Sequence, residues 1–182
     1  FFDEKINILS GLSNQNTIYC KEADYFTIYF SDRHGFNNDD SVYDKNDKVL
    51  LIGDSYTHGA CVKEGEDIAG KLRKKGINAI NLGMGGNSEI TKLATFKEYG
   101  QYLNPTKVLW MYTIGDLKGA LGELENENIK KYYFDDNYTQ KLINLNDKKN
   151  KFIDEYLSPL EKKESLDYFF GHFTFYDLRK FI

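Results

Sequence analysis

The sequence predicts an α/β fold: a three-layer α/β/α domain with a mostly parallel, flavodoxin-like sheet, an N-terminal arm and C-terminal helices. The first observation behind this is three apolar runs of strand length, at residues 49–52, 78–82 and 107–112. The second is their spacing of roughly thirty residues with one helical pattern between them, the length of a parallel βαβ unit. The third is that each run leads into glycine and small polar residues, which are typical of turns at a sheet edge.

Residues 1–47 are predicted to be an arm laid against the main domain, because they lack sustained helical periodicity. Within this arm, Tyr25–Phe30 is rich in strand-forming residues and predicts a short β segment. A polar turn around one glycine follows at residues 31–38. The α/β domain itself is expected to span residues 48–182.

Two helices are predicted between the three strands. The first covers residues 66–75 and ends at Gly76, which suits a left-handed C-cap. The second follows the glycine-rich turn at residues 83–87, is N-capped by Ser88 and ends at Asn104-Pro105. Their inward-facing residues are expected to be Ile68, Ala69 and Leu72 in the first helix, and Ile90, Leu93, Ala94 and Tyr99 in the second.

From about residue 118 the strand–helix alternation stops, and a helical insertion or extension is predicted. Its helices are expected over residues 121–133, 137–157 and 165–182. The last two are amphipathic, and we interpret their apolar stripes as packing faces. A partner-binding face or a lipid-facing lid is the alternative.

Composition excludes several function classes. The 182 residues carry a net charge of −4 and no long basic tract, which argues against nucleic acid as a partner. No run is apolar enough for a transmembrane helix, and no signal-peptide pattern is visible. Because the chain opens at Phe1 without Met, loss of an upstream leader or anchor is one interpretation, and both a cytoplasmic and a cell-envelope location stay open.

The two cysteines, Cys20 and Cys61, lack the spacing of a metal site, and no cofactor or metal is predicted. They are compatible with one disulfide in an oxidising compartment and equally with two free thiols. A phosphate-binding role for the glycine-rich turn is disfavoured, since neither a Gly-Lys-Ser sequence nor a full dinucleotide fingerprint is present.

Right-handed crossovers would bring three turns to one edge of the sheet: residues 53–55, 83–87 and 114–116. A serine hydroxyl at that edge is placed for chemistry, which makes Ser55 the leading candidate. The alternative is that Asp54 or Ser55 only caps the next helix. Asp54 is expected to fix the turn through backbone hydrogen bonds.

With these three turns the chain resembles the SGNH (GDSL-like) hydrolase superfamily. Gly53-Asp54-Ser55 matches its first block, residues 81–87 are similar to the second and residues 108–117 to the third. The resemblance is closer to an uncharacterised bacterial branch, whose similarity begins near Thr17 and includes the Asp32–Asn38 turn.

The resemblance implies serine-dependent ester hydrolysis without a cofactor or metal. Ser55 would be the nucleophile, and the N–H groups of Ser55 and Gly86 would form the oxyanion hole. Further residues are expected to line the site: Asp54, His58, Asn87, Gly115 and Asp116. For His58, a place on the helix surface is more common than a role as the base.

Two departures from the family pattern weaken the site. The third block has Asp116 directly after Gly115, where the family has an asparagine that donates to the oxyanion, and an ionised carboxylate cannot donate. The Asp-x-x-His block that supplies the general base is missing, which implies a catalytic domain incomplete at its C-terminus. His172 is a weak candidate for the base, and His34 is expected to be structural.

The sequence therefore predicts an SGNH-type esterase or acyl-transfer domain. Its expected substrate is an O-acyl ester, either a small molecule or a carbohydrate or lipid. The alternative is a catalytically silent binding or scaffold module, or an inactive fragment, of the same fold.

Overall fold

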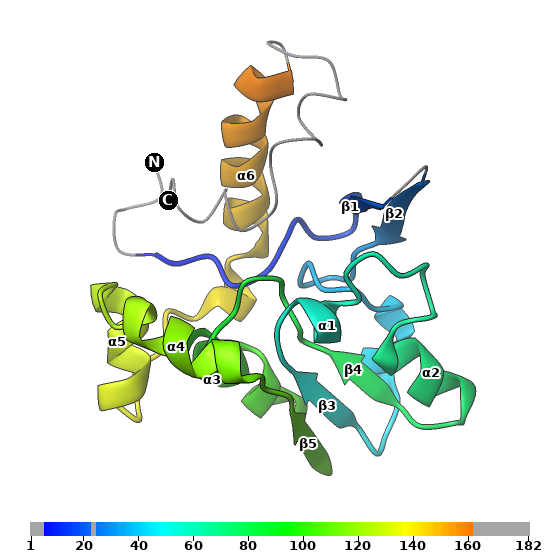
Figure 1. Cartoon of the computed structure of the whole chain (residues 1–182), viewed down its shortest axis with the longest axis horizontal. Helices are drawn as coiled ribbons and strands as arrows, with labels where there is room; N and C mark the ends of the chain where they lie inside the picture. The colour runs from blue at the N-terminus through cyan, green and yellow to red at the C-terminus, as the bar shows by residue number, and fades with distance from the viewer. Residues whose placement is uncertain (1–5, 23–24, 162–182) are drawn as a thin grey trace.

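The computed structural model describes residues 6–22 and 25–161 of the chain (Figure 1). Its strands are β1 (Asn16–Glu22), β2 (Tyr25–Phe30), β3 (Val49–Ile52), β4 (Ala79–Asn81) and β5 (Lys107–Trp110). Its helices are α1 (Ser55–His58), α2 (Ile68–Lys74), α3 (Glu89–Glu98), α4 (Ile114–Glu123), α5 (Glu127–Phe134) and α6 (Asn146–Glu161).

The main sheet consists of three parallel strands in the order β4-β3-β5. Numbered from β3, this is the order 2-1-3 at the start of a flavodoxin-like sheet. The register pairs Leu50 with Ile80 on one side and with Val108 on the other. The predicted α/β class and the parallel sheet are confirmed. A separate antiparallel hairpin is formed by β1 and β2.

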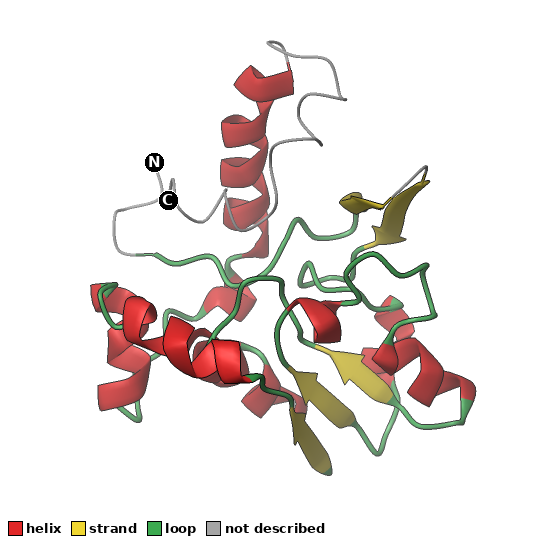
Figure 2. Cartoon of the chain, in the orientation of Figure 1, coloured by secondary structure: helices red, strands yellow, loops and turns green. Residues whose placement is uncertain are grey.

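Alternation along β3 creates the layers. Leu50 and Ile52 belong to the larger core cluster, together with residues of α3 and α5. Leu51 belongs to a smaller cluster on the opposite face, with Ala69 of α2. Because successive side chains of a strand point to opposite faces, these clusters identify helical layers on both sides of the sheet (Figure 2).

The strand β5 differs from its neighbours because its four side chains are all exposed. Parallel strands are ordinarily covered on both faces, and β3 and β4 follow this rule. Exposed apolar residues continue from β5 into α4, notably Tyr112, Ile114 and Leu117.

Local capping explains where the helices begin. The Asp67 carboxylate accepts the Gly70 N–H at 3.1 Å and starts α2. The Asn126 side chain accepts the N–H groups of Asn128 and Ile129 and starts α5. A single helix over residues 121–133 is therefore wrong, since α4 ends before this cap and α5 begins after it.

Other predictions about the elements also change. The strand β1 was not expected from the sequence, and it pairs with the predicted β2. The helix expected at 137–157 instead consists of a 3-10 turn, Leu142–Asn144, followed by α6. The helix expected over residues 165–182 lies outside the described residues. The division of the chain at residue 47 stays a prediction.

The helix α6 is anchored at its first turns and then extends away from the sheet (Figure 1). Lys149 is buried, and its Nζ donates to Ser10 Oγ, Ser13 Oγ and the His34 carbonyl at 2.9, 3.2 and 2.7 Å. Asn150 also bonds the backbone of Ser13. These contacts join α6 to the N-terminal segment.

Candidate functional site at the carboxyl edge of the sheet

Ser55 is the first residue of α1 and follows β3 after a two-residue turn. The Asp54 carboxylate accepts the Tyr56 N–H at 3.0 Å and so fixes the start of this one-turn helix. The helix ends at Gly59, which has φ +92° and donates its N–H to the Ser55 carbonyl. Ser55 is half-buried, so its side chain lies at the surface of the sheet edge.

The turn at residues 83–87 lies directly against this helix. The Met84 N–H donates to the Gly53 carbonyl at 3.2 Å, which joins the first and second turns by a backbone hydrogen bond. A Cβ on Gly83 would lie 2.6 Å from the backbone nitrogen of His58 and from Cβ of Thr57. Glycine is therefore required at this point by the close approach of two backbones.

The second turn has the pattern of a type II β-turn. The Asn87 N–H donates to the Met84 carbonyl at 3.2 Å, and Gly86 has φ +80°. Gly86 is exposed, whereas Gly85 and Asn87 are buried. Gly86 is thus an exposed residue on the turn that adjoins α1, which Ser55 begins.

Met111, which precedes the third turn, joins this part of the chain to the residues on either side of the first turn. Its N–H donates to the Ile52 carbonyl at 2.8 Å, and its sulfur accepts the Thr57 hydroxyl at 3.4 Å. Gly115 and Asp116 were expected in a loop, but they lie in the first turn of α4. Thr113 and Asp116 form a capping box there, which explains why the helix starts this early.

Asp116 is directed towards Lys92 of α3. The Lys92 Nζ lies 2.7 Å from Asp116 Oδ2, 3.0 Å from the Met111 carbonyl and 2.9 Å from Glu89 Oε1, and its side chain has no exposed surface. Burial acts to raise the pKa of Asp116, but hydrogen bonds from Lys92 and Thr113 hold it below its ordinary value. Asp116 is therefore an ion-pair partner in this structure.

Sequence reasoning missed Lys92 because α3 was expected to bury only one face. In the structure α3 packs between the sheet and the helices α4 and α5, so Lys92 and Glu98 are also buried. The Glu98 carboxylate accepts the Tyr132 hydroxyl and two backbone N–H groups. The sequence of a helix with one apolar stripe does not indicate that its charged residues will also be buried by other helices.

His58 is fully buried, which corrects the expectation of a helix-surface position. Its Nε2 lies 2.8 Å from the Tyr29 hydroxyl, and its Nδ1 accepts the Gly85 N–H at 3.2 Å. The ring also stacks on Tyr19, with centroids 3.9 Å apart.

His34 occupies a different part of the fold. Its Nδ1 lies 3.1 Å from the Asn146 amide nitrogen, and its ring packs edge-on against Tyr43. Burial, with the nearby charges of Lys149 and Arg33, lowers the pKa of His34 to about 4. Both ring nitrogens of His58 and the Nδ1 of His34 are thus bonded to groups other than Ser55, and His172 lies outside the described residues.

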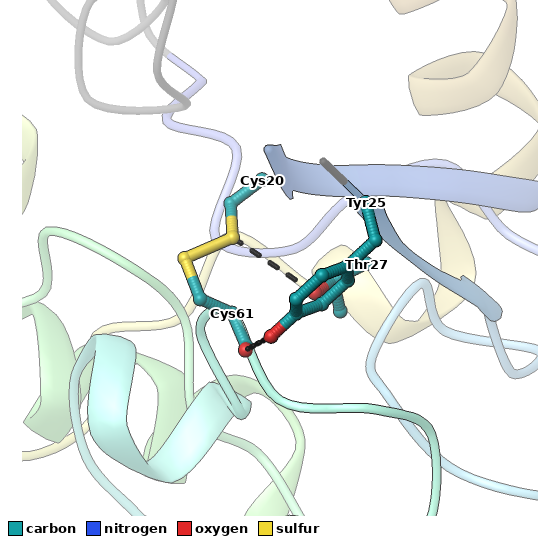
Figure 3. The surroundings of a disulfide bond; sticks show 4 residues. All are labelled: Cys20, Tyr25, Thr27 and Cys61. Carbon is teal, nitrogen blue, oxygen red and sulfur yellow. Dashed lines mark hydrogen bonds between the residues drawn. A yellow bond between two sulfur atoms is a disulfide. The ribbon is translucent and has the colours of Figure 1, made fainter. Parts of the chain in front are cut away.

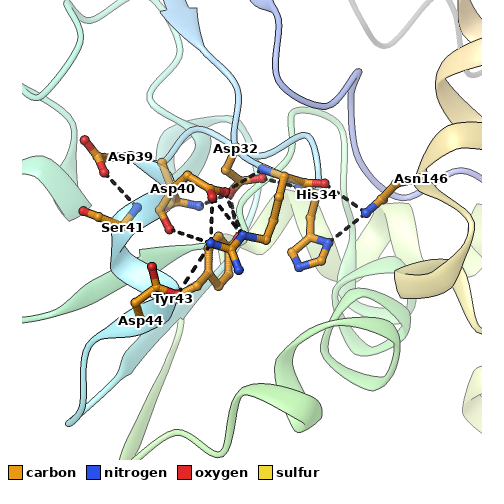
Figure 4. Close-up of polar contacts among 10 residues, drawn as sticks. Asp32, His34, Asp39, Asp40, Ser41, Tyr43, Asp44 and Asn146 are labelled. Atoms are coloured by element: carbon orange, nitrogen blue, oxygen red, sulfur yellow. Dashed lines mark hydrogen bonds and ion pairs between the residues drawn. The ribbon is translucent and has the colours of Figure 1, made fainter.

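The polar turn before β3 is organised by Asp32 (Figure 4). Its buried carboxylate accepts hydrogen bonds of 2.6–2.9 Å from four groups: the backbone N–H groups of His34 and Phe36, the Asn38 amide and the Tyr43 hydroxyl. Burial nevertheless raises the pKa of Asp32. Asp32 thus holds the turn together through its four hydrogen bonds, a role that the sequence did not predict.

Asn38 and Asn81 connect that polar turn to the candidate site. The Asn38 side chain bonds both the N–H and the carbonyl of Asn81, each at 2.8 Å. The Asn81 side chain in turn donates to the Thr57 carbonyl and accepts the Gly83 N–H, at 2.7 and 2.8 Å. Asn81 therefore fixes α1 and the second turn relative to each other.

The structure joins Cys20 of β1 to Cys61, three residues after His58, in a disulfide (Figure 3). The Tyr25 hydroxyl also donates to the Cys61 carbonyl at 3.0 Å. Of the two possibilities that the sequence left open, the disulfide is the one observed. It ties the β1–β2 hairpin to the loop that leaves α1.

Within residues 6–22 and 25–161, no group of three or more metal-ligating side chains is found. Nor does any helix in those ranges have the length and apolarity needed to cross a membrane.

No family model matches the chain, and no curated protein matches it. Among solved structures it is similar to a mutant of the esterase AlinE4, with 19% identity over 65% of this chain and 81% of that chain. The TM-score is 0.33, so this similarity carries no argument about the function of the chain.

Proposed function

We propose that this chain is an SGNH-type serine ester hydrolase or acyl-transfer domain with Ser55 as nucleophile. In this reaction Ser55 Oγ attacks the carbonyl carbon of an O-acyl ester, and the N–H groups of Ser55 and Gly86 stabilise the oxyanion. The ester C–O bond then breaks, the serine proton goes to the leaving alcohol, and an acyl-serine forms. Water or an acceptor hydroxyl takes the acyl group from Ser55 and returns a proton to Oγ. The substrate class is an acylated small molecule, carbohydrate or lipid.

The observation that carries this proposal is the hydrogen bond between the Met84 N–H and the Gly53 carbonyl. It holds the two glycine turns together at the carboxyl edge of the parallel sheet, where ligands bind in such folds. Half-buried Ser55 and exposed Gly86 then lie on adjoining turns. Asn87, on the second turn, is proposed to line the same site.

The same site predicts slow turnover. Asp116 is paired with Lys92 and cannot donate to an oxyanion. Losing one such donor typically costs about 100- to 1000-fold in rate. Both ring nitrogens of His58 and the Nδ1 of His34 are also engaged by other groups, and within the described residues neither ring is hydrogen-bonded to Ser55 by these contacts.

These two features favour a second candidate function, a catalytically silent binding or scaffold module of the same fold. In such a module Ser55 would serve only as the N-terminal residue of α1. The two candidates differ in the reactivity of a single hydroxyl, which can be measured directly.

Hydrolysis of p-nitrophenyl acetate and labelling by a fluorophosphonate test the proposal on three proteins: wild type, Ser55→Ala and Ser41→Ala. Ser41 is an exposed serine in the 3-10 turn Asp40–Asp44 and serves as the matched control. We expect slow hydrolysis and labelling in wild type and Ser41→Ala, and neither in Ser55→Ala. Equal rates and no labelling in all three proteins would exclude Ser55 as a nucleophile and favour the catalytically silent alternative.

A further variant, His172→Ala, tests the remaining imidazole. A loss of hydrolysis as large as that of Ser55→Ala would assign His172 as the proton acceptor. An unchanged rate would remove it from the proposed site.

A further inference from the structure

The ring of His58 has one hydrogen-bonding state that satisfies its contacts. The Gly85 N–H can only donate, so His58 Nδ1 must accept with its lone pair. A neutral imidazole with an acceptor at Nδ1 carries its proton on Nε2, which then donates to the Tyr29 hydroxyl 2.8 Å away. The two contacts together fix both the tautomer and the ring orientation.

The hydrogen bond between the Gly85 N–H and His58 Nδ1 restricts the conformation of the second turn. Gly85 and Gly86 are its two central residues, and two glycines permit several orientations of the peptide between them. The direction of the Gly86 N–H depends on that orientation. His58 holds the N–H of Gly85 at one end of the turn, and the Asn87 N–H closes the other end on Met84.

The ring is held in turn by the β1–β2 hairpin. Tyr19 stacks on it, and a Cβ on Gly85 would lie only 2.5 Å from the Tyr19 hydroxyl oxygen. Tyr29, on the other strand, is buried and bonds Nε2. The Cys20–Cys61 disulfide fastens the hairpin next to Tyr19 and three residues after His58.

We propose that His58 is a positioning residue for the oxyanion hole. It acts through Gly85 to orient the Gly86 N–H, and the disulfide-tethered hairpin holds its ring through Tyr19 and Tyr29. This inference rests on the proposed function of Ser55 and Gly86. It gives the β1–β2 hairpin a role at the site, although its strands are not part of the main sheet.

The kinetic test uses His58→Leu, which removes both ring nitrogens, and His58→Asn, whose amide oxygen takes the place of Nδ1. His34→Leu is the matched control, since His34 is the other described histidine and has no bond to the second turn. We expect kcat for p-nitrophenyl acetate to fall about 10- to 100-fold in His58→Leu with KM unchanged, as for a displaced catalytic group. His58→Asn should recover most of this loss, and His34→Leu should retain the wild-type kcat.

Hydrogen exchange of the Gly85 amide, followed by NMR, gives a readout that does not depend on activity. We expect exchange about tenfold faster in His58→Leu, the effect of one lost hydrogen bond, and wild-type exchange in His34→Leu. Tyr29→Phe keeps the imidazole and removes its Nε2 partner, so it should change exchange in the same direction by less. This variant decides the question if His58→Leu does not fold.

The outcomes separate the two proposals. If wild type has no Ser55-dependent hydrolysis, the proposed function fails, and Gly85 exchange alone judges whether His58 holds the turn. If hydrolysis is present, but His58→Leu keeps both the wild-type kcat and the wild-type Gly85 exchange, the positioning role is overturned. The same exchange rate in Tyr29→Phe as in wild type would contradict the role of the hairpin.

Discussion

The Lys92 Nζ lies 2.7 Å from Asp116 Oδ2, in a position where neither side chain has substantial contact with solvent. This pair joins α3 to the first turn of α4 beside the third turn of the candidate site. It gives a physical account of the carboxylate at position 116. The charge of Asp116 is compensated by Lys92, and the charge of Lys92 requires a partner because it is buried.

Asp116→Asn should therefore destabilise the protein. Removing one partner of a buried ion pair typically costs about 3–5 kcal/mol in unfolding free energy, and the lower end is expected because Glu89 stays close to Lys92. Urea unfolding of wild type, Asp116→Asn, Lys92→Met and the double variant measures the coupling. The double variant should lose less unfolding free energy than the two single variants lose together. If the two losses simply add, the pairing of Asp116 with Lys92 is contradicted.

Gly83→Ala should be destabilising, and Gly122→Ala should not. An added methyl at Gly83 meets the backbone of α1, and such overpacking costs about 1–3 kcal/mol. At Gly122, in α4, a Cβ meets open space, and alanine gains about 0.5–1 kcal/mol over glycine in a helix. Thermal and urea unfolding check both, and equal midpoints for the two variants would refute the close contact at Gly83.

Lys149 should make the protein more stable as the pH rises from 7 to 9. Burial lowers the pKa of Lys149 to about 7, partly offset by the charge of Asp32, so the unfolded chain binds roughly half a proton more than the folded chain at pH 7 and nearly a whole proton more above about pH 8. The contribution of Lys149 to the free energy of unfolding therefore rises with pH, at a rate that approaches roughly 1.4 kcal/mol per pH unit. This increase of the unfolding free energy with pH should be lost in Lys149→Met. It should be kept in Lys151→Met, which changes an exposed lysine of the same helix. Identical slopes in both variants would exclude Lys149 as the cause.

The Cys20–Cys61 disulfide should be detectable in protein purified without reductant. Denaturation under non-reducing conditions is expected to expose no free thiol, and reduction should lower the unfolding free energy by about 2–4 kcal/mol. The double variant Cys20→Ala, Cys61→Ala should lose a similar amount and no longer respond to reductant. Two titratable thiols in the oxidised preparation would show that the bond is not formed.

Much of the main sheet follows from local sequence. The run at β3 is apolar on both faces, and the glycine turns after β3 and β4 leave few alternatives to strand–turn–helix units. A right-handed crossover then brings the turns to one edge. The fold class and the strand regions near 49–52, 78–82 and 107–112 were predictable for this reason, whereas the roles of the site residues stay predictions.

Contacts between distant segments could not be predicted in this way. The cap at Asn126 divides a helical pattern that periodicity reads as continuous. The strand β1 forms only because β2 pairs with it, and its own composition is mixed. The burial of Lys92 depends on the packing of α4 against α3, which no local pattern encodes.

Gly53-Asp54-Ser55 and the glycine turn at residues 83–87 were identifiable from the sequence alone, because glycine, a capping carboxylate and an apolar strand constrain the backbone over a few residues. Residues 114–116 were expected in a third turn, but they form the start of α4. Tertiary structure alone decided what surrounds them: His58 turned inward onto Gly85, and Asp116 turned towards Lys92. Each of these contacts joins residues at least 24 positions apart. Whether a polar side chain is buried with a partner depends on the packing of whole elements, which the local pattern around either residue does not contain.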